Sequence, residues 1–344
     1  MCTAITLQSL PGAAYLGRNM DFSYLLQPHF YFIPKNYRWT SPITHKDIHN
    51  SYSFMGIGQE LDGVLGFFDG VNEHGFAAAA LYFAGYAKYD NAAIRNASTI
   101  QVASYDFLTY ILGHCASVED LLTQMDTISI IGVSDPLTQT VAPLHWIAQD
   151  RTGNCVVLEL TDRGAEMYHN SIGVLANSPD FRWHMTNLRN YMDTSPRQTE
   201  NAVWGGVPLM PFGQGGGTVS LPGGYTSPER FVRAAYLKTH TLAPKNTEAA
   251  VISFFQIMKS VSIPQGAVVT ARDTNDYTQY TAFIDLNTRN YFFNTYENLQ
   301  TIKVDFPIAL PLSTTIIDLG EIVQPMTFEQ LALTVEGNGR GMWT

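Results

Sequence analysis

Charged residues are scarce in this chain, at 15% of its 344 positions, whereas hydrophobic residues make up 45%. Disordered proteins show the opposite balance, so the composition predicts a sizeable hydrophobic core. Basic residues are few as well: 20 Lys and Arg stand against 30 Asp and Glu, which gives a net charge of −10. An acidic chain without blocks of like charge is a poor ligand for nucleic acid or an anionic membrane. We therefore expect neither as a partner.

The sequence also lacks segments that would direct it into or across a membrane. Residues 1–4 have neither the basic nor the apolar part of a secretory signal, and no run approaches the ~18 apolar residues of a membrane span. The three cysteines, Cys2, Cys115 and Cys155, are too few for a disulfide framework. These absences together predict a reduced, cytoplasmic protein. Cys115 falls on the apolar face of a predicted helix and Cys155 in an apolar predicted strand, so we expect both to be core residues.

The spacing of apolar residues and turns predicts an α+β fold. A strand over 2–7, a turn at Pro11-Gly12 and a strand over 13–19 form an N-terminal hairpin, and the run of four alanines within 75–83 has strand-like flanks. Further strands are predicted over 30–33, 52–57, 144–148, 154–160, 173–176, 277–284 and 291–296, and helices over 107–115, after caps at Ser117 and Ser227, and over 248–258. Without an internal repeat or linker, this order predicts stacked sheets covered by helices in one domain, 1–344.

Cys2 is the first candidate for catalysis because it directly follows the initiator methionine. Its small side chain permits removal of Met1, after which one residue would carry both a thiol and a free α-amino group. A thiolate is a strong nucleophile and an α-amine titrates near neutral pH, so the pair can attack a carbonyl carbon and move the displaced proton. The alternative is a small residue tolerated on an edge strand.

A charged pair is expected beside Cys2. The predicted hairpin returns Arg18 and Asp21 to the start of the chain. A guanidinium there would stabilise the thiolate, and a carboxylate would hold the α-amine through a charge-assisted hydrogen bond. The alternative for these two residues is an ordinary surface ion pair.

Several short motifs accompany Cys2 in order along almost the whole chain. They are Arg18-Asn19-Met20-Asp21-Phe22, Asn72-Glu73-His74-Gly75-Phe76, Leu81-Tyr82-Phe83-Ala84-Gly85-Tyr86, Leu144-His145-Trp146, Asn177-Ser178-Pro179-Asp180-Phe181, Gly213-Gln214-Gly215, Ser227-Pro228-Glu229-Arg230-Phe231 and Tyr277-Thr278-Gln279-Tyr280-Thr281. Through them the sequence resembles the choloylglycine hydrolase family, which groups bile salt hydrolases with penicillin V acylases.

The resemblance implies a four-layer αββα sandwich of the N-terminal-nucleophile hydrolase type, with an autoprocessed Cys2 that hydrolyses a linear amide. Asn177 and the backbone N–H of Tyr82 resemble the family's oxyanion donors, each typically worth ~10²–10³ in rate. Arg230 resembles an arginine that completes the polar network around the nucleophile. The alternative for Asn177 is a turn residue before Ser178, and for Arg230 a solvated residue of the first helical turn.

Tyr82 also bears on the substrate. Bile salt hydrolases of the family usually have asparagine at this position and penicillin V acylases often have tyrosine, whose ring can stack on a phenoxy group. The resemblance therefore favours hydrolysis of penicillin V, with conjugated bile salts as the alternative and acyl-homoserine lactones as a third possibility. The predicted acyl pocket comprises Met20, Phe22, Tyr24, Leu61 and Tyr82. A non-catalytic role is disfavoured because every family catalytic position is filled.

No cofactor or metal is expected. His45 and His49 are four residues apart but lack further ligands, and the glycine-rich run 213–217 is not followed by the Lys-Ser/Thr of a phosphate loop. The long segment 190–227 resembles the region through which the family assembles tetramers. We therefore expect a homotetramer that acts on a small N-acyl amide.

Overall fold

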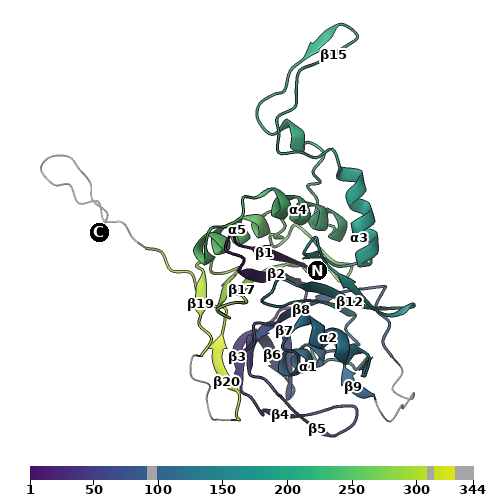
Figure 1. The fold of residues 1–344 in the computed structure, drawn as a ribbon, viewed down its shortest axis with the longest axis vertical. Helices are drawn as coiled ribbons and strands as arrows, with labels where there is room; N and C mark the ends of the chain where they lie inside the picture. The colour runs from purple at the N-terminus through teal and green to yellow at the C-terminus, as the bar shows by residue number, and fades with distance from the viewer. Residues whose placement is uncertain (91–98, 308–313, 330–344) are drawn as a thin grey trace, which may run out of the picture.

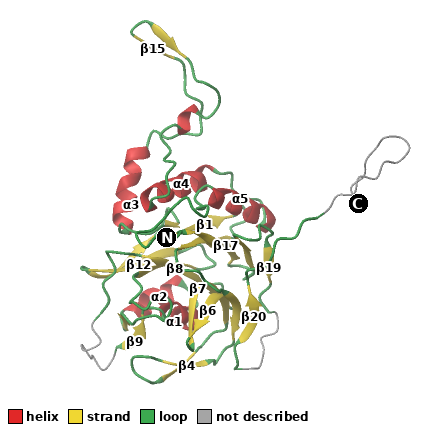
Figure 2. Ribbon diagram, turned by 180° about the vertical axis from the view of Figure 1, so that it is seen from behind, coloured by secondary structure: helices red, strands yellow, loops and turns green. Residues whose placement is uncertain are grey.

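The computed structural model describes residues 1–90, 99–307 and 314–329. Within them two large antiparallel sheets lie face to face, and helices cover the outer side of each (Figure 1 and Figure 2). This arrangement confirms the four-layer αββα sandwich expected from the sequence. The predicted single domain also includes residues 330–344, which lie outside the described residues.

The six-stranded sheet carries the N-terminus and has the order β14-β1-β2-β17-β18-β19. β1 (Cys2–Gln8) and β2 (Ala14–Phe22) form the predicted hairpin, with Ala4 opposite Arg18. β1 lies between β14 and β2, and β14 pairs with it at Ala4 and Ile5. The remaining strands are β14 (Val174–Leu175), β17 (Tyr277–Asp285), β18 (Tyr291–Thr295) and β19 (Ile302–Val304).

The eight-stranded sheet has the order β13-β12-β11-β8-β7-β6-β3-β20. The alanine run lies in its strand β8 (Ala77–Tyr82), as predicted, while β7 (Val64–Asn72) was not predicted. The other strands are β3 (His29–Ile33), β6 (Phe54–Leu61), β11 (Leu144–Gln149), β12 (Cys155–Thr161), β13 (Gly164–His169) and β20 (Ile317–Glu321).

Two helices cover each sheet. α1 (Phe107–His114) and α2 (Val118–Met125) lie over the eight-stranded sheet, and α4 (Ser227–His240) and α5 (Thr247–Lys259) over the six-stranded one (Figure 2). Ser117 caps α2 as predicted, by accepting a hydrogen bond from the backbone N–H of Asp120 at 3.1 Å. The cap of α4 is Thr226 instead of Ser227, because Thr226 and Glu229 form a capping box one residue earlier.

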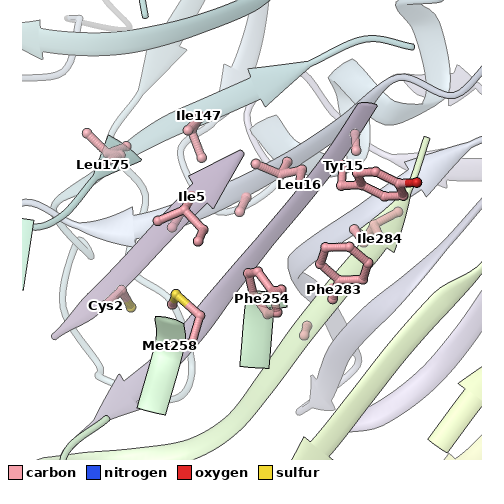
Figure 3. Packing of buried hydrophobic residues seen from close by; sticks show 14 of the residues in the cluster. Cys2, Ile5, Tyr15, Leu16, Ile147, Leu175, Phe254, Met258, Phe283 and Ile284 are labelled. Carbon is pink, nitrogen blue, oxygen red and sulfur yellow. The ribbon is translucent and has the colours of Figure 1, made fainter. Parts of the chain in front are cut away.

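α5 packs closely on the sheet that carries Cys2. A side chain at Gly17 would meet the ring of Phe254 at 2.4 Å, so glycine allows the helix to approach β2. Figure 3 shows Cys2 and Ile5 on one strand and Leu16 and Tyr15 on its neighbour, and Phe254 and Met258 of α5 belong to the same buried cluster. The nucleophile candidate thus sits on a strand packed from both sides, which limits its motion.

Between α3 (Phe181–Asn187) and α4 the chain leaves the sandwich as a projecting arm (Figure 1). The predicted loop 190–227 contains a small hairpin within this arm. The short elements of the structure are β4 (Arg38–Thr40), β5 (Asp47–His49), β9 (Ile100–Ala103), β10 (Ile128–Ile131), β15 (Ala202–Trp204), β16 (Val207–Leu209) and the 3₁₀ turns Leu188–Tyr191 and Gly216–Thr218.

Candidate active site

Arg18 is brought to Cys2 by the register of the hairpin. Cys2 is 3% exposed and Arg18 is 1% exposed, and Nη2 of the arginine lies 2.6 Å from Sγ of the cysteine. The rest of the guanidinium is held by the carbonyl oxygens of Phe68, at 3.1 Å, and Asn19, at 3.2 Å. Burial opposes the charge of Arg18, but nearby Cys2 and other acidic groups raise its pKa, so it stays protonated. The cation is therefore in direct contact with the sulfur.

Asp69 belongs to this cluster although sequence reasoning did not select it. Its Oδ2 lies 3.5 Å from Nη1 of Arg18, and the hydroxyls of Tyr280 and Tyr291 donate to its two oxygens. Burial raises the pKa of Asp69, while Arg18 and the two hydroxyls oppose that shift. The carboxylate thus holds one terminal nitrogen of the guanidinium while the other contacts the sulfur. The available signal was a single acid in the apolar run 64–72.

Asp21 and the N-terminus lie together. Oδ1 of Asp21 accepts a hydrogen bond from Thr278 at 2.6 Å, whereas the buried Oδ2 has no hydrogen-bond partner among the described residues and lies 3.6 Å from Nη1 of Arg230. Burial raises the pKa of the Asp21 carboxyl and Arg230 opposes the shift. The Met1 amine donates to the carbonyl oxygen of Asp21 at 2.6 Å and lies 3.2 Å from Asp276. Oxygen acceptors therefore surround an amino group here.

Asn177 contacts Cys2 through its side-chain oxygen. Oδ1 accepts from the backbone nitrogen of Cys2 at 2.7 Å and from Nη2 of Arg230 at 2.7 Å. Because both partners are donors, the other amide atom is the nitrogen, and Nδ2 donates to the carbonyl oxygen of Tyr82 at 2.7 Å. One N–H of Asn177 is thus occupied, and Nδ2 has no second hydrogen-bond partner among the described residues.

Arg230 is fully buried, so the alternative of a solvated residue is wrong. Nη1 donates to the carbonyl oxygen of Cys2 at 2.6 Å and to the hydroxyl of Thr3, and Nε donates to the carbonyl oxygen of Tyr225 at 2.9 Å. With the bond to Asn177, the guanidinium ties the first turn of α4 to the start of β1. The guanidinium thereby links Cys2 to Asn177.

The backbone N–H of Tyr82 faces away from β11. The neighbouring Phe83 donates to the carbonyl oxygen of Pro143 at 2.7 Å, and in an antiparallel pair adjacent residues direct their N–H groups to opposite sides. The Tyr82 N–H therefore points toward β7, whose pairing with β8 ends at Asp69 and Ala79. This places a second donor where the ladder has ended.

Two buried histidines hold the peptide groups around Asn177, and neither was selected from the sequence as a site residue. His145 lies 2.8 Å from the carbonyl oxygen of Ala176 and 3.1 Å from Glu159, and His184 lies 2.8 Å from the carbonyl oxygen of Asn177. Burial lowers the pKa of His184 to about 4, so its imidazole is neutral and donates from Nε2. These bonds fix the backbone that carries the Asn177 amide.

An apolar pocket opens on Cys2. Of the five predicted pocket residues, Met20, Phe22, Leu61 and Tyr82 line it. The other lining residues are Gln59, Val64, Gly66, Phe67, Phe68, Ala80, Tyr105, Asp135, Pro136, Leu137, Thr138, Ala142 and Leu144. An apolar lining of this kind suits an apolar acyl group.

Tyr24, the fifth predicted pocket residue, lies outside this lining. Its ring packs 5.2 Å from that of Phe22 and under the guanidinium of Arg272, which lies 4.0 Å from the ring centroid. Phe22 lies in turn 6.1 Å from Tyr82. Tyr24 is therefore one side chain removed from the pocket, and Arg272 covers it.

The remaining candidates lie away from the pocket. Cys115 and Cys155 are buried and free, and burial raises the pKa of each thiol to about 12, which makes them unreactive core residues as predicted. His, Cys, Asp and Glu side chains form no group of three that could hold a metal ion within the described ranges. None of the helices there is long and apolar enough to cross a membrane.

Comparison with known proteins gives the family. The sequence profile of the linear amide C–N hydrolases, choloylglycine hydrolase family, matches residues 2–315. The bile salt hydrolase/transferase of Clostridium perfringens (strain 13 / Type A) is 34% identical over 307 residues, 89% of this chain and 92% of that protein. A crystal structure of the C2A mutant of conjugated bile acid hydrolase from Clostridium perfringens is 31% identical with a TM-score of 0.88, covering 96% of this chain and 100% of that one.

A penicillin V acylase from Agrobacterium tumefaciens shares the fold at lower similarity. Its structure is 20% identical, with a TM-score of 0.74 over 93% of this chain and 91% of that one. The two bile acid relatives are more similar to the chain, so the expectation of a closer match to penicillin V acylases is not supported. What is shown is the reaction class and the lineage: the chain belongs to the choloylglycine hydrolase family and is a linear amide C–N hydrolase.

Proposed function

We propose that the enzyme hydrolyses the amide bond of conjugated bile acids through a thioester on Cys2. The observation that carries the mechanism is the 2.6 Å contact between Nη2 of Arg18 and Sγ of Cys2 at the apolar pocket. The substrate is supported by the relatives named for bile salts, at 34% and 31% identity. This choice reverses the preference for penicillin V that Tyr82 suggested in the sequence.

In the proposed acylation, the Cys2 sulfur attacks the amide carbon and the thiol proton moves to the α-amine of the same residue. The carbonyl oxygen becomes an oxyanion that accepts hydrogen bonds from the free N–H of Asn177 and from the N–H of Tyr82. When the carbon–nitrogen bond breaks, the α-ammonium gives its proton to the leaving nitrogen. The products of this half-reaction are a free amine and a thioester.

Deacylation repeats these roles with water. The α-amine accepts a proton from water as the oxygen attacks the thioester, and the thiolate leaves beside Arg18. This scheme requires removal of Met1, because the nitrogen of Cys2 is otherwise an amide. We expect intact-mass spectrometry of the active enzyme to show a chain without Met1. Full activity in a chain that retains Met1 would contradict the role of the α-amine.

One observation favours penicillin V as a second candidate. Tyr82 and Phe22, 6.1 Å apart, present two aromatic rings to the pocket, and rings of this kind stack on a phenoxy group. A rigid steroid makes the opposite demand, because it needs an open apolar slot. The two substrates therefore differ in whether truncation of the Tyr82 ring helps or harms binding.

The deciding experiment compares glycocholate, taurocholate and penicillin V with one purified enzyme. We expect a kcat/KM at least tenfold higher for a bile conjugate, no activity in Cys2→Ala, and full activity in Cys155→Ala, a buried cysteine away from the pocket. A higher kcat/KM for penicillin V would reverse the substrate assignment. Hydrolysis by Cys2→Ala at the wild-type rate would overturn the mechanism.

We also propose that the arm, residues 190–227, assembles the single-domain chain into a homotetramer. The arm exposes large apolar side chains, including Trp204 at 75% and Phe212 completely. Apolar side chains gathered on a projecting element are typical of a protein interface, and burial against further copies of the chain would remove them from water. Light scattering should give four times the 38.2 kDa mass of one chain. A particle of monomer mass would reject the proposal.

A further inference from the structure

Arg272, near the active site, forms no ion pair with a carboxylate among the residues that the structure describes. It lies in the loop between α5 and β17, where its guanidinium stacks on the ring of Tyr24 at 4.0 Å and Nη2 donates to the hydroxyl of Ser23 at 2.7 Å. Both contacts are electrically neutral. Arg163, by comparison, pairs with two carboxylates, Glu166 and Asp180. The charge of Arg272 is therefore held in place but remains available to a ligand.

A chain of aromatic rings connects Arg272 with the pocket. Tyr24 packs on Phe22, and Phe22 packs on Tyr82, two residues that line the pocket together with Cys2. Burial raises the pKa of Tyr82, Tyr24 and Asp135 add to the shift, and Arg272 opposes it. The guanidinium thus acts electrostatically on the pocket rim from just outside it.

The apolar pocket explains binding of the acyl side of the amide but not of the amine side. The acyl group lies among apolar walls, so the amine must extend from Cys2 toward the pocket opening. Asp135, a carboxylate that lines the pocket, accepts hydrogen bonds from Thr138 and is therefore engaged by donors. Arg272, in contrast, has a charge to offer. Without this cation, an anionic group on the leaving amine would be repelled by a chain of net charge −10.

We propose that Arg272 binds the anionic group of the leaving amine and makes the enzyme selective for amides whose amine product carries a carboxylate or sulfonate. The inference deepens the proposed function and rests on it, because it concerns the same site. It applies to glycine and taurine conjugates alike. It also applies to the thiazolidine carboxylate of penicillin V, so it does not depend on the acyl group.

The guanidinium suits this role for two reasons. Its planar fork matches the paired oxygens of a carboxylate or sulfonate, and stacking on Tyr24 orients it before the substrate arrives. Because the site is open to water, the gain is that of an exposed ion pair. We expect about a fivefold effect on kcat/KM, which corresponds to ~1 kcal/mol.

The test pairs each anionic substrate with a neutral analogue that keeps the same acyl group. Glycocholate is compared with the N-methylamide of cholic acid, and penicillin V with its methyl ester, for wild type, Arg272→Gln and Arg272→Lys. Arg289→Gln is the matched control, since Arg289 also lies over an aromatic ring, that of Phe306, but away from the pocket. Each kcat/KM is measured at low and at high salt.

We expect Arg272→Gln to lower kcat/KM about fivefold for the anionic member of a pair, through KM, and to leave the neutral member unchanged. Arg272→Lys should recover part of the loss, and added salt should reduce the wild-type preference. Equal hydrolysis of both members by wild type, or an equal loss for both in Arg272→Gln, would overturn the proposal. If the enzyme hydrolyses neither bile acid amide but does hydrolyse the penicillins, the proposed substrate is wrong. The penicillin pair then tests the role of Arg272.

Discussion

Replacing Asn177 by aspartate tests the oxyanion donor with little change in shape. The substitution exchanges Nδ2 for an oxygen and keeps Oδ1, which accepts from the Cys2 nitrogen and from Arg230 at 2.7 Å each. The two hydrogen bonds that fix the side chain should therefore survive. Only the donor side changes, where Nδ2 now faces the carbonyl oxygen of Tyr82 at 2.7 Å.

Two effects lower kcat when Nδ2 is replaced by an oxygen. Loss of one oxyanion donor lowers kcat by about 10²–10³. A carboxylate oxygen would also stand where negative charge develops, so the loss should reach at least the upper end of that range. The new charge is paired with Arg230 and the α-ammonium, and the repelled carbonyl oxygen of Tyr82 costs roughly 1–3 kcal/mol of folding free energy. The melting temperature should fall by only a few degrees, and KM should stay within about threefold.

Steady-state kinetics and thermal unfolding of the same preparation check both values. Asn170→Asp is a matched control: Asn170 is also buried, donates to the carbonyl oxygen of Val174 at 3.0 Å and accepts from the Gly173 N–H at 2.8 Å. It should lose stability and keep kcat. The oxyanion assignment would be refuted if Asn177→Asp kept kcat within fivefold of wild type. An equal fall of kcat in the control would show a general loss of folding instead.

Three further outcomes follow from buried and exposed groups. Burial raises the pKa of Asp106 from 3.8 to about 7, so the folded state favours the protonated carboxyl and loses that stability as the pH rises through 7. Asp106→Asn removes the ionisable group. In urea unfolding it should therefore gain up to roughly 4 kcal/mol of stability at pH 8 and less at pH 5. A gain independent of pH would contradict this. Asp69→Asn leaves Arg18 without its carboxylate and should cost ~3–5 kcal/mol of stability by urea unfolding, whereas a loss below 1 kcal/mol would show that the tyrosine hydroxyls alone hold the site. The double change Trp204→Ser and Phe212→Ser should lower the particle mass in light scattering at unchanged kcat per chain, and an unchanged mass would reject the arm as the interface.

Local patterns predicted the parts of the fold that depend on local contacts. The N-terminal hairpin, the alanine strand and the cap at Ser117 follow from turn residues, strand length and capping chemistry. β7 was missed because its glycines and Asp69 have low strand propensity. The strand forms because it pairs with β6 and β8, contacts that no local pattern contains.

In the candidate site, too, local contacts were predictable from the sequence and distant contacts were not. Hairpin register alone places Arg18 beside Cys2. The environment of Arg230 depends instead on contacts more than fifty residues away, to Cys2, Thr3 and Asn177, and helix position alone predicted a solvated residue. The family resemblance supplied that assignment. Asp69 acts on the site through Arg18, and His184 acts through Asn177. The motifs around the nucleophile therefore did not identify these two residues.

The pocket walls and the Cys2 sulfur come from different segments of the chain, so substrate specificity and chemistry can evolve separately. The sulfur and its cation come from the paired strands β1 and β2, while Leu61 and Val64 come from the end of the β6–β7 hairpin and Asp135 to Ala142 from a connecting segment. Mutations in these segments can reshape the proposed acyl pocket without moving Cys2. A lineage built this way can pass from one acyl group to another in small steps, each intermediate remaining a working amidase.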